Sequence, residues 1–258
     1  LLIGIAIDQG MIEGVDQPLS ELLPGYAHLL TGDKADITLE HVLTMTTGLR
    51  WVDFGIGNSF DRIAAAPDSV EFILDEPLET TPGEVFFYNT GSSHLLSAIV
   101  HYNAGTSTAE YAEQHLFELL GVGDYTWPAL QDGVNQGGWG MYMRPRDFLK
   151  LGQLLLDGGA WDGQQVVSEW FVDAATAHQV DTVYGGGYGY QMWIETQLFD
   201  VDDIAGARGW GGQDCLVLDD LDVVVVFTGD IAHPYEMAEH VPFLVNDYVI
   251  PAHVGPGH

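Results

Sequence analysis

The stretch Ile204-AGARGWGGQDCLVLDDLDVVVVF-Thr228 decides the fold class, because it alternates short β-rich runs with turns. Its runs, 204–210, 213–218 and 222–228, are joined by only two or three residues. Parallel strands need a crossover of about a dozen residues or more, whereas connections this short join antiparallel neighbours. The sequence therefore predicts an antiparallel sheet in this part of the chain.

The residues on either side of this stretch complete the expected fold. Tyr188–Glu195 is a further β-rich run, and a helix is expected from about Pro234 to Val249. Upstream, apolar residues recur at helical spacing from Ser92 to Tyr102, which places Tyr88 in the loop just before a helix. We expect a single α+β domain over 1–258, with a helical part at about 13–184 and the sheet with its C-terminal helix at about 185–258.

The charge of the chain excludes several classes of partner. Its 38 acidic residues against 7 Lys and Arg give a formal net charge of −31. Nucleic acids and anionic membrane surfaces carry the same sign of charge, so neither is expected to bind. Salt relieves the mutual repulsion, since the Debye length falls from about 10 Å at 0.1 M to about 3 Å at 1 M. The composition predicts a salt-adapted protein, with an acidic secreted protein as the alternative.

The sole cysteine, Cys215, lies in an apolar run, which indicates a buried small side chain rather than a reactive thiol. No internal disulfide is possible, so cysteine usage indicates neither an oxidising nor a reducing compartment. No apolar run in the sequence reaches the length of a membrane span, and none has the pattern of a signal peptide.

The first residues resemble the inside of a buried helix. Leu1 opens an apolar run that continues to Asp8, as expected of a helix surrounded by protein. We therefore expect the sequence to be a fragment cut inside that helix. A secreted or periplasmic location stays open, because any signal would precede Leu1.

Four short motifs carry the functional information. They are Leu43-Thr44-Met45-Thr46-Thr47-Gly48-Leu49, Tyr88-Asn89-Thr90-Gly91-Ser92, Gln136-Gly137-Gly138-Trp139-Gly140-Met141-Tyr142-Met143-Arg144-Pro145-Arg146-Asp147 and Gly209-Trp210-Gly211-Gly212-Gln213. In this order they resemble the penicillin-recognising serine hydrolases, which include class C β-lactamases, D-alanyl carboxypeptidases, family VIII esterases and 6-aminohexanoate-dimer hydrolases. The resemblance implies a β-lactamase/transpeptidase-like fold, an antiparallel sheet flanked by helices with a helical subdomain, here lacking the N-terminal strands.

The motif that would hold the nucleophile is missing from the sequence. The family carries its serine in S-x-x-K, yet neither Lys34 nor Lys150 has a serine three residues before it. Thr31 has the spacing to Lys34, but it lies in a polar loop where a turn is expected. The resemblance implies a serine hydrolase that acts on a carboxylic ester or amide through an acyl-enzyme, with its nucleophile segment absent from this chain. The alternative is a non-catalytic binding or regulatory member of the same fold.

Tyr88 is the catalytic residue that the resemblance implies within this chain. In the family either the tyrosine of Y-x-N or the lysine of S-x-x-K takes the serine's proton and passes it to the leaving group. A phenol has an ordinary pKa of about 10, so it needs a neighbouring ammonium to act as a base. The third residue of the motif is Thr90 instead of asparagine, and either Asn89 or Thr90 is expected to supply the polar contact to the substrate.

The Trp210-Gly211-Gly212 run corresponds to the family's K-T-G position and resembles the esterase branch. Its glycines would let a substrate carbonyl approach the backbone, and the N–H of Gln213 is the implied second half of the oxyanion hole. Taken alone, the run indicates a glycine-rich β-turn. Arg208 would either contact a substrate carboxylate or pair with nearby acids.

No metal or other cofactor is expected. The ten histidines are scattered, without an H-E-x-x-H pattern or a comparable cluster with carboxylates. Two acidic runs have calcium-ligand character, but acidic turns on a salt-adapted surface are the plainer interpretation; their members are Asp200, Asp202, Asp203, Asp219, Asp220 and Asp222. The expected partner is a small-molecule ester or amide whose identity depends on pocket shape.

Overall fold

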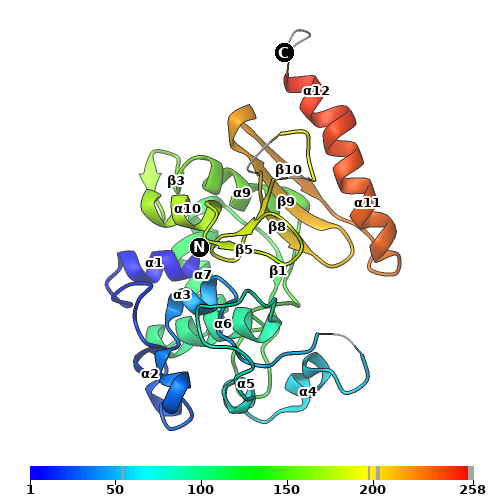
Figure 1. The fold of residues 1–258 in the computed structure, drawn as a ribbon. Coiled ribbons are helices and arrows are strands. Elements are labelled where there is room, and N and C mark those ends of the chain that lie inside the picture. The colour runs from blue at the N-terminus through cyan, green and yellow to red at the C-terminus, as the bar shows by residue number, and fades with distance from the viewer. Residues whose placement is uncertain (54, 197, 202–203, 255–258) are drawn as a thin grey trace. The chain divides into compact units, whose positions relative to one another are not determined.

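The computed structural model describes residues 1–53, 55–196, 198–201 and 204–254 (Figure 1). The chain divides into two compact units, Leu1–Tyr142 and Met143–His258. The second unit contains the two helices that precede the large sheet, whereas the sequence grouped these helices with the helical part. The expectation of one domain over the whole chain stays a prediction.

The first unit is mainly helical. Its elements are α1 (Leu2–Asp8), α2 (Leu19–Leu22), α3 (Leu39–Leu43), α4 (Ser59–Ala65), α5 (Ser69–Asp75), α6 (Thr90–Ala104), α7 (Thr108–Ala112), a π-helical turn (Glu113–Phe117), α8 (Glu118–Leu120), β1 (Tyr125–Thr126), the start of β2 (Tyr142–Met143) and 3-10 turns at Pro24–Tyr26 and Gly32–Asp36. Helix α6 packs against α1, α3, α5 and α7 and is buried along most of its length. It begins at the cap residue Asn89 and ends at Gly105, whose positive φ suits a glycine.

The second unit is built around one antiparallel sheet. Its elements are α9 (Pro145–Leu156), β3 (Ala160–Trp161), β4 (Gln164–Gln165), α10 (Glu169–Thr176), β5 (Val180–Asp181), β6 (Gly187–Tyr188), β7 (Trp193–Glu195), β8 (Ile204–Gly209), β9 (Gln213–Leu218), a 3-10 turn (Asp219–Leu221), β10 (Val223–Phe227), α11 (Pro234–Leu244), a π-helical turn (Val245–Val249) and α12 (Ile250–His253). The strand order is β10-β9-β8-β7-β6-β5, and each pair of neighbours is antiparallel. The predicted antiparallel sheet is confirmed.

Side chains on the two faces of this sheet alternate along β9 and pack against different helices. Leu216 and Leu218 join a cluster with Val241 and Val245 of the C-terminal helices. On the other face, Val217 packs with residues of β7, β8 and α9. The C-terminal helices lie along one face of the sheet in Figure 1. Cys215 is buried as predicted, and burial raises the pKa of its thiol to about 12.

Two sequence-based boundaries differ from the structure. Tyr188–Glu195 is two short strands instead of one, because Gln191 has a φ of 62° and turns the chain between them. The C-terminal helix starts at Pro234 as predicted, but it passes through a π-helical turn at Val245–Val249 and continues to His253.

Along the described residues, no helix is both long and apolar enough to cross a bilayer.

Candidate active site

Tyr88 lies in the loop immediately before α6, as the sequence predicts. Its side chain is half-buried, and burial raises the pKa of the phenol, with a further increase from the carboxylate of Asp53. The phenol is therefore neutral at ordinary pH. In this environment Tyr88 can donate a proton, and it would need a nearby cation to serve as a base.

Asn89 caps α6 and is only 1% exposed. Its Oδ1 accepts a hydrogen bond from the backbone N–H of Ser92 at 3.1 Å, and its Nδ2 donates to the carbonyl of Leu49 at 3.3 Å. With these two partners, the Asn89 side chain stabilises the start of the helix and holds the neighbouring loop at Leu49. Thr90 is the next residue and is buried at the first position of the helix.

The 43–49 motif supports the loop that carries Tyr88. The backbone N–H of Phe87 donates to the carbonyl of Met45 at 2.9 Å, and that of Gly83 donates to the carbonyl of Thr46 at 2.8 Å. Gly48 has a φ of 74°, and a Cβ there would lie 2.2 Å from the carbonyl oxygen of Thr80. Glycine is thus required at Gly48, both for its conformation and for space.

A Ser-His-Asp arrangement, with a buried serine and histidine and a half-buried aspartate, lies at the first turns of α6. The Oγ of Ser69 is 2.7 Å from Nε2 of His94 and 2.5 Å from Oδ2 of Asp132. Burial lowers the pKa of His94 to about 4, against the opposing effect of Asp132, so the imidazole is neutral at pH 7. The sequence analysis did not find this group, because its members are far apart in the chain; a histidine within the apolar face of α6 was the only local signal.

In the second unit, the Trp210-Gly211-Gly212 run is the loop of the β8–β9 hairpin, closed by the pair Gly209 and Gln213. Gly211 and Gly212 have φ values of 82° and 75°, and a Cβ on Gly211 would lie 2.9 Å from Cα of Ile231. The turn interpretation of this run is therefore observed, and Gln213 is the first residue of β9. The Nε2 of Gln213 donates to the carbonyl of Gly229 at 2.9 Å.

Arg208 pairs with two local acids, which is one of its two expected roles. Its Nη1 is 2.6 Å from Oε1 of Glu195, and its Nε is 2.9 Å from Oδ1 of Asp214. These pairs join β7, β8 and β9 on one face of the sheet. A contact between Arg208 and a substrate carboxylate stays a prediction.

Trp210 is 51% exposed, and its ring packs edge-on against the ring of Tyr235 with centroids 5.7 Å apart. The predicted residues thus fall into two local groups. Tyr88, Asn89 and Thr90 are contiguous at the start of α6, and the run 208–213 forms one hairpin.

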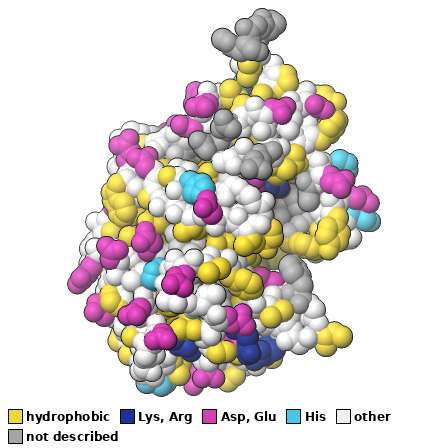
Figure 2. All heavy atoms as spheres, viewed as in Figure 1, with side chains coloured by type: hydrophobic (Ala, Val, Ile, Leu, Met, Phe, Trp, Pro, Cys, Tyr) yellow, Lys and Arg dark blue, Asp and Glu magenta, His cyan; other side chains and the backbone are white. Residues whose placement is uncertain are grey.

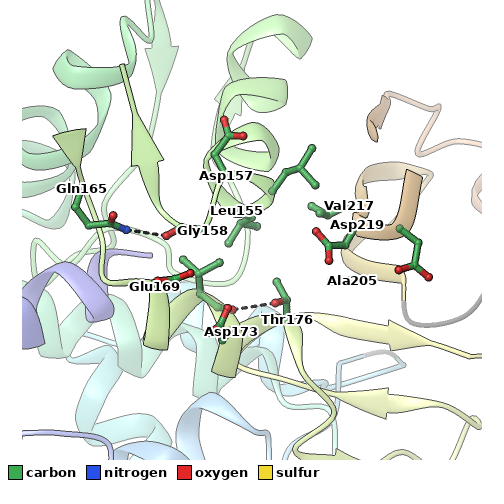
Figure 3. A pocket seen from close by; sticks show the side chains of 13 residues that line it. Leu155, Asp157, Gly158, Gln165, Glu169, Asp173, Thr176, Ala205, Val217 and Asp219 are labelled. Carbon is green, nitrogen blue, oxygen red and sulfur yellow. Dashed lines mark hydrogen bonds between the residues drawn. The ribbon is translucent and has the colours of Figure 1, made fainter. Parts of the chain in front are cut away.

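The second unit also has a hollow of about 630 Å³ that contains none of the predicted site residues (Figure 3). Leu155, Val172, Ala205 and Val217 contribute apolar surface to it. Its carboxylates come from Asp157, Glu169, Asp173, Asp219 and Asp220. Acidic side chains are also spread over the face shown in Figure 2, where Lys and Arg are few.

Among the residues that the structure describes, no three His, Cys, Asp or Glu side chains are grouped so that they could hold a metal ion. Asp202 and Asp203 of the first acidic run lie outside the described residues. Asp219 and Asp220 belong to a 3-10 turn that Asp222 ends.

Comparison with known proteins gives a family from the sequence and a shared fold from the structure. The model of the Beta-lactamase family matches residues 1–248. The 6-aminohexanoate-dimer hydrolase of Paenarthrobacter ureafaciens is 26% identical over 187 residues, which cover 68% of this chain and 47% of that protein. The chain therefore spans about half the length of this curated relative.

Solved structures share the fold at low identity. A Bacillus anthracis protein described provisionally as a 6-aminohexanoate-dimer hydrolase has a TM-score of 0.80 at 18% identity, over 98% of this chain and 69% of that chain. A penicillin-binding protein from Bacillus halodurans has a TM-score of 0.72 at 21% identity, over 94% of this chain and 82% of that chain. A family VIII carboxylesterase has a TM-score of 0.69 at 15% identity, over 94% of this chain and 79% of that chain. The predicted fold, an antiparallel sheet with flanking helices of the β-lactamase/transpeptidase-like type, is confirmed.

Proposed function

Because the chain belongs to the Beta-lactamase family, we propose that its natural parent is a serine hydrolase acting on a small carboxylic ester or amide through an acyl-enzyme. The observation that carries the proposal is the placement of Tyr88 at the start of α6, in a loop supported by the 43–49 motif. The names of the relatives, an amide-dimer hydrolase and a carboxylesterase, support the same substrate class.

In this proposal the nucleophile comes from residues that the 258 do not include, since no serine stands three residues before a lysine. A lysine ammonium near Tyr88 would oppose the effects of burial and Asp53 on its pKa and would favour the phenolate. The phenolate could then take the serine's proton and return it to the leaving group. β10, at the edge of the sheet in the described residues, is an apolar strand that added strands of the parent would cover.

The polar contact to the substrate is assigned to Thr90. The amide of Asn89 has both a donor and an acceptor role within the protein, which leaves the neighbouring hydroxyl as the better candidate. In the second unit, the backbone N–H of Gln213 would stabilise the oxyanion, and Trp210, Gly211 and Gly212 would border the substrate. Arg208 positions the strands of this hairpin through its ion pairs.

Substitution of Tyr88 in the full-length parent tests the proposal. Tyr88→Phe should lower kcat for p-nitrophenyl acetate by about 10²–10⁴, the usual contribution of a general acid or base. Tyr102→Phe is the matched control, since Tyr102 lies at the far end of α6 and its hydroxyl bonds to that of Tyr26 at 2.9 Å. Its kcat should stay within about twofold of the parent. Equal kcat values for the parent and Tyr88→Phe would remove Tyr88 from the mechanism.

The 258-residue chain alone should hydrolyse no p-nitrophenyl acetate above the buffer rate, because it has no S-x-x-K. The natural gene should encode that motif before Leu1. Turnover by the chain alone that a serine-directed inhibitor abolishes would contradict this assignment. A parent without S-x-x-K would instead favour a non-catalytic binding or regulatory protein.

A further inference from the structure

We propose that Ser69 and His94 are positioning residues that hold a glycine strip, residues 136–139, against the first turn of α6. The inference rests on the proposed function, because that turn follows Tyr88 and contains Thr90. Neither residue touches the substrate in this proposal. Their effect passes through the backbone of the strip.

The hydrogen bonds assign every proton in the group. The backbone N–H of Gly137 donates to Nδ1 of His94 at 3.2 Å, so the ring carries its proton on Nε2. Nε2–H then donates to the Oγ of Ser69, whose hydroxyl donates to Oδ2 of Asp132. Asp132 also accepts the backbone N–H groups of Ser69 and Val134. The result is a complete relay of hydrogen bonds from a carboxylate to the backbone of the glycine strip.

This arrangement differs from a catalytic triad. In a triad the serine hydroxyl donates to histidine, and the carboxylate orients the ring. Here the hydroxyl donates to the carboxylate, and Ser69 is 0% exposed. A substrate has no path to this oxygen in the folded unit. The group therefore acts by holding structure in place.

The glycine strip lies too close to α6 for any side chain at its two glycines. A Cβ on Gly137 would lie 2.3 Å from the carbonyl oxygen of Ser93, and one on Gly138 would lie 2.6 Å from Cγ2 of Thr90. The ring of Trp139 follows, with its centroid 5.6 Å from that of His94. The bond from Gly137 to His94 therefore fixes the distance between the strip and Thr90.

Ser97, a buried serine in the middle of α6, provides a comparison with Ser69, which begins α5. Ser97 donates to the carbonyl of Asn135 at 2.7 Å and is bonded to Thr108 at 3.0 Å. Like Ser69, it is buried with two side-chain hydrogen bonds. It lies two helical turns beyond Thr90 and holds residue 135, whereas His94 holds Gly137, one of the two glycines that lie against the first turn of α6.

Two amide replacements of His94 separate the positioning role from general stability. In His94→Asn, Oδ1 can replace Nδ1 and still accept from Gly137, while the bond to Ser69 is lost. In His94→Gln, Nε2 can still donate to Ser69, while the acceptor for Gly137 is lost. We expect His94→Gln to lower kcat of the full-length parent about tenfold more than His94→Asn, in assays below the melting temperature of both variants.

Hydrogen–deuterium exchange of the 132–139 region supplies a readout independent of activity. The amide of Gly137 should lose protection in His94→Gln and keep it in His94→Asn. At a similar loss of melting temperature, Ser69→Ala should lower kcat more than Ser97→Ala does, because Ser97 holds residue 135 and Ser69 acts through His94 on Gly137. Equal exchange and equal kcat for the two His94 variants would overturn the proposal.

The test separates this inference from the proposed function. If Tyr88→Phe leaves kcat unchanged, the catalytic assignment fails, and the exchange difference at Gly137 still decides the positioning role. If Tyr88→Phe lowers kcat and the two His94 variants behave alike, only the positioning role fails.

Discussion

The start of α6 and the β8–β9 hairpin carry the residues of the proposed site, and they are held in different ways. At α6 the holding groups are buried side chains, such as Asn89 and His94, each with a donor and an acceptor contact. In the hairpin the shape depends on backbone that only glycine adopts readily, at Gly211 and Gly212. Removal of a polar group should therefore damage the first region, and addition of a Cβ should damage the second.

The largest expected difference between the two regions is in how folding stability depends on pH. This dependence should come from His94 at the start of α6. The pKa of His94 is lowered to about 4 in the folded protein, against about 6.5 in an unfolded chain. A lowered folded pKa means that the stabilisation is complete above pH 6.5 and is lost as the pH falls toward 4. Folding stability should drop by about 2 kcal/mol between pH 7.5 and pH 5 from this group alone.

Denaturant unfolding of the parent and of His94→Asn at both pH values measures this effect. At pH 7.5 the variant should have a lower free energy of unfolding than the parent. On moving to pH 5 the variant should lose less of that free energy than the parent does, and the difference is the contribution of His94. A pH dependence identical in the two proteins would show that His94 titrates normally in the folded state.

The hairpin gives the next largest effect. Gly211→Ala forces a residue with a Cβ to a φ of 82° and into backbone atoms of Ile231. Gly163→Ala is the matched control, since Gly163 has a φ of 79° and nothing within 4 Å of an added Cβ. The control should cost about 1–2 kcal/mol for its conformation alone, and Gly211→Ala should cost at least about 1 kcal/mol more.

Thermal or denaturant unfolding of both variants checks this prediction, and the proposed oxyanion role adds a kinetic readout. In the full-length parent, Gly211→Ala should also lower kcat, because it displaces the backbone before Gln213. Gly163→Ala should leave kcat unchanged. Equal destabilisation by the two substitutions would show that the loop relaxes around the new Cβ.

The same contrast explains how much of the molecule could be predicted from the sequence. Strand β9, Gln213–Leu218, has the predicted bounds, because paired glycines are a local signal at its start. The break between β6 and β7 was missed, because Gln191 adopts a positive φ that its residue type does not indicate.

Part of the candidate site could also be predicted from local sequence, and part could not. Tyr88, Thr90 and the hairpin loop could be located from contiguous motifs. The relay of Ser69, His94 and Asp132 joins residues 25 and 63 positions apart, so only the folded chain brings them together. The cap role of Asn89 was also hidden, because the same residue type in the same motif suits a substrate contact.

Salt should have a smaller effect, because it acts on surface charges and not on the buried groups or the glycines that hold the two regions. The carboxylates around the hollow of the second unit repel one another, and screening shortens the range of that repulsion. The melting temperature of the parent should rise by several degrees between about 0.1 M and about 2 M KCl. Asp219→Asn with Asp220→Asn should reduce that rise. A flat or falling melting temperature would contradict adaptation to high salt.

The smallest expected difference compares two asparagine caps. Asn89 caps α6 from a buried position and also donates to the buried carbonyl of Leu49. Asn58 caps α4 at the surface: its Oδ1 accepts from the N–H of Asp61 at 2.7 Å, and its Nδ2 donates to the carbonyl of Gly55 at 2.8 Å, where water can replace the bond. Substitution of a cap by alanine costs about 0.5–2 kcal/mol, and a buried carbonyl left without its donor adds to the cost. Asn89→Ala should therefore destabilise the chain by about 1 kcal/mol more than Asn58→Ala in denaturant unfolding. Equal losses would mean that water replaces the bond to Leu49, and the start of α6 would then be held less firmly than its burial indicates.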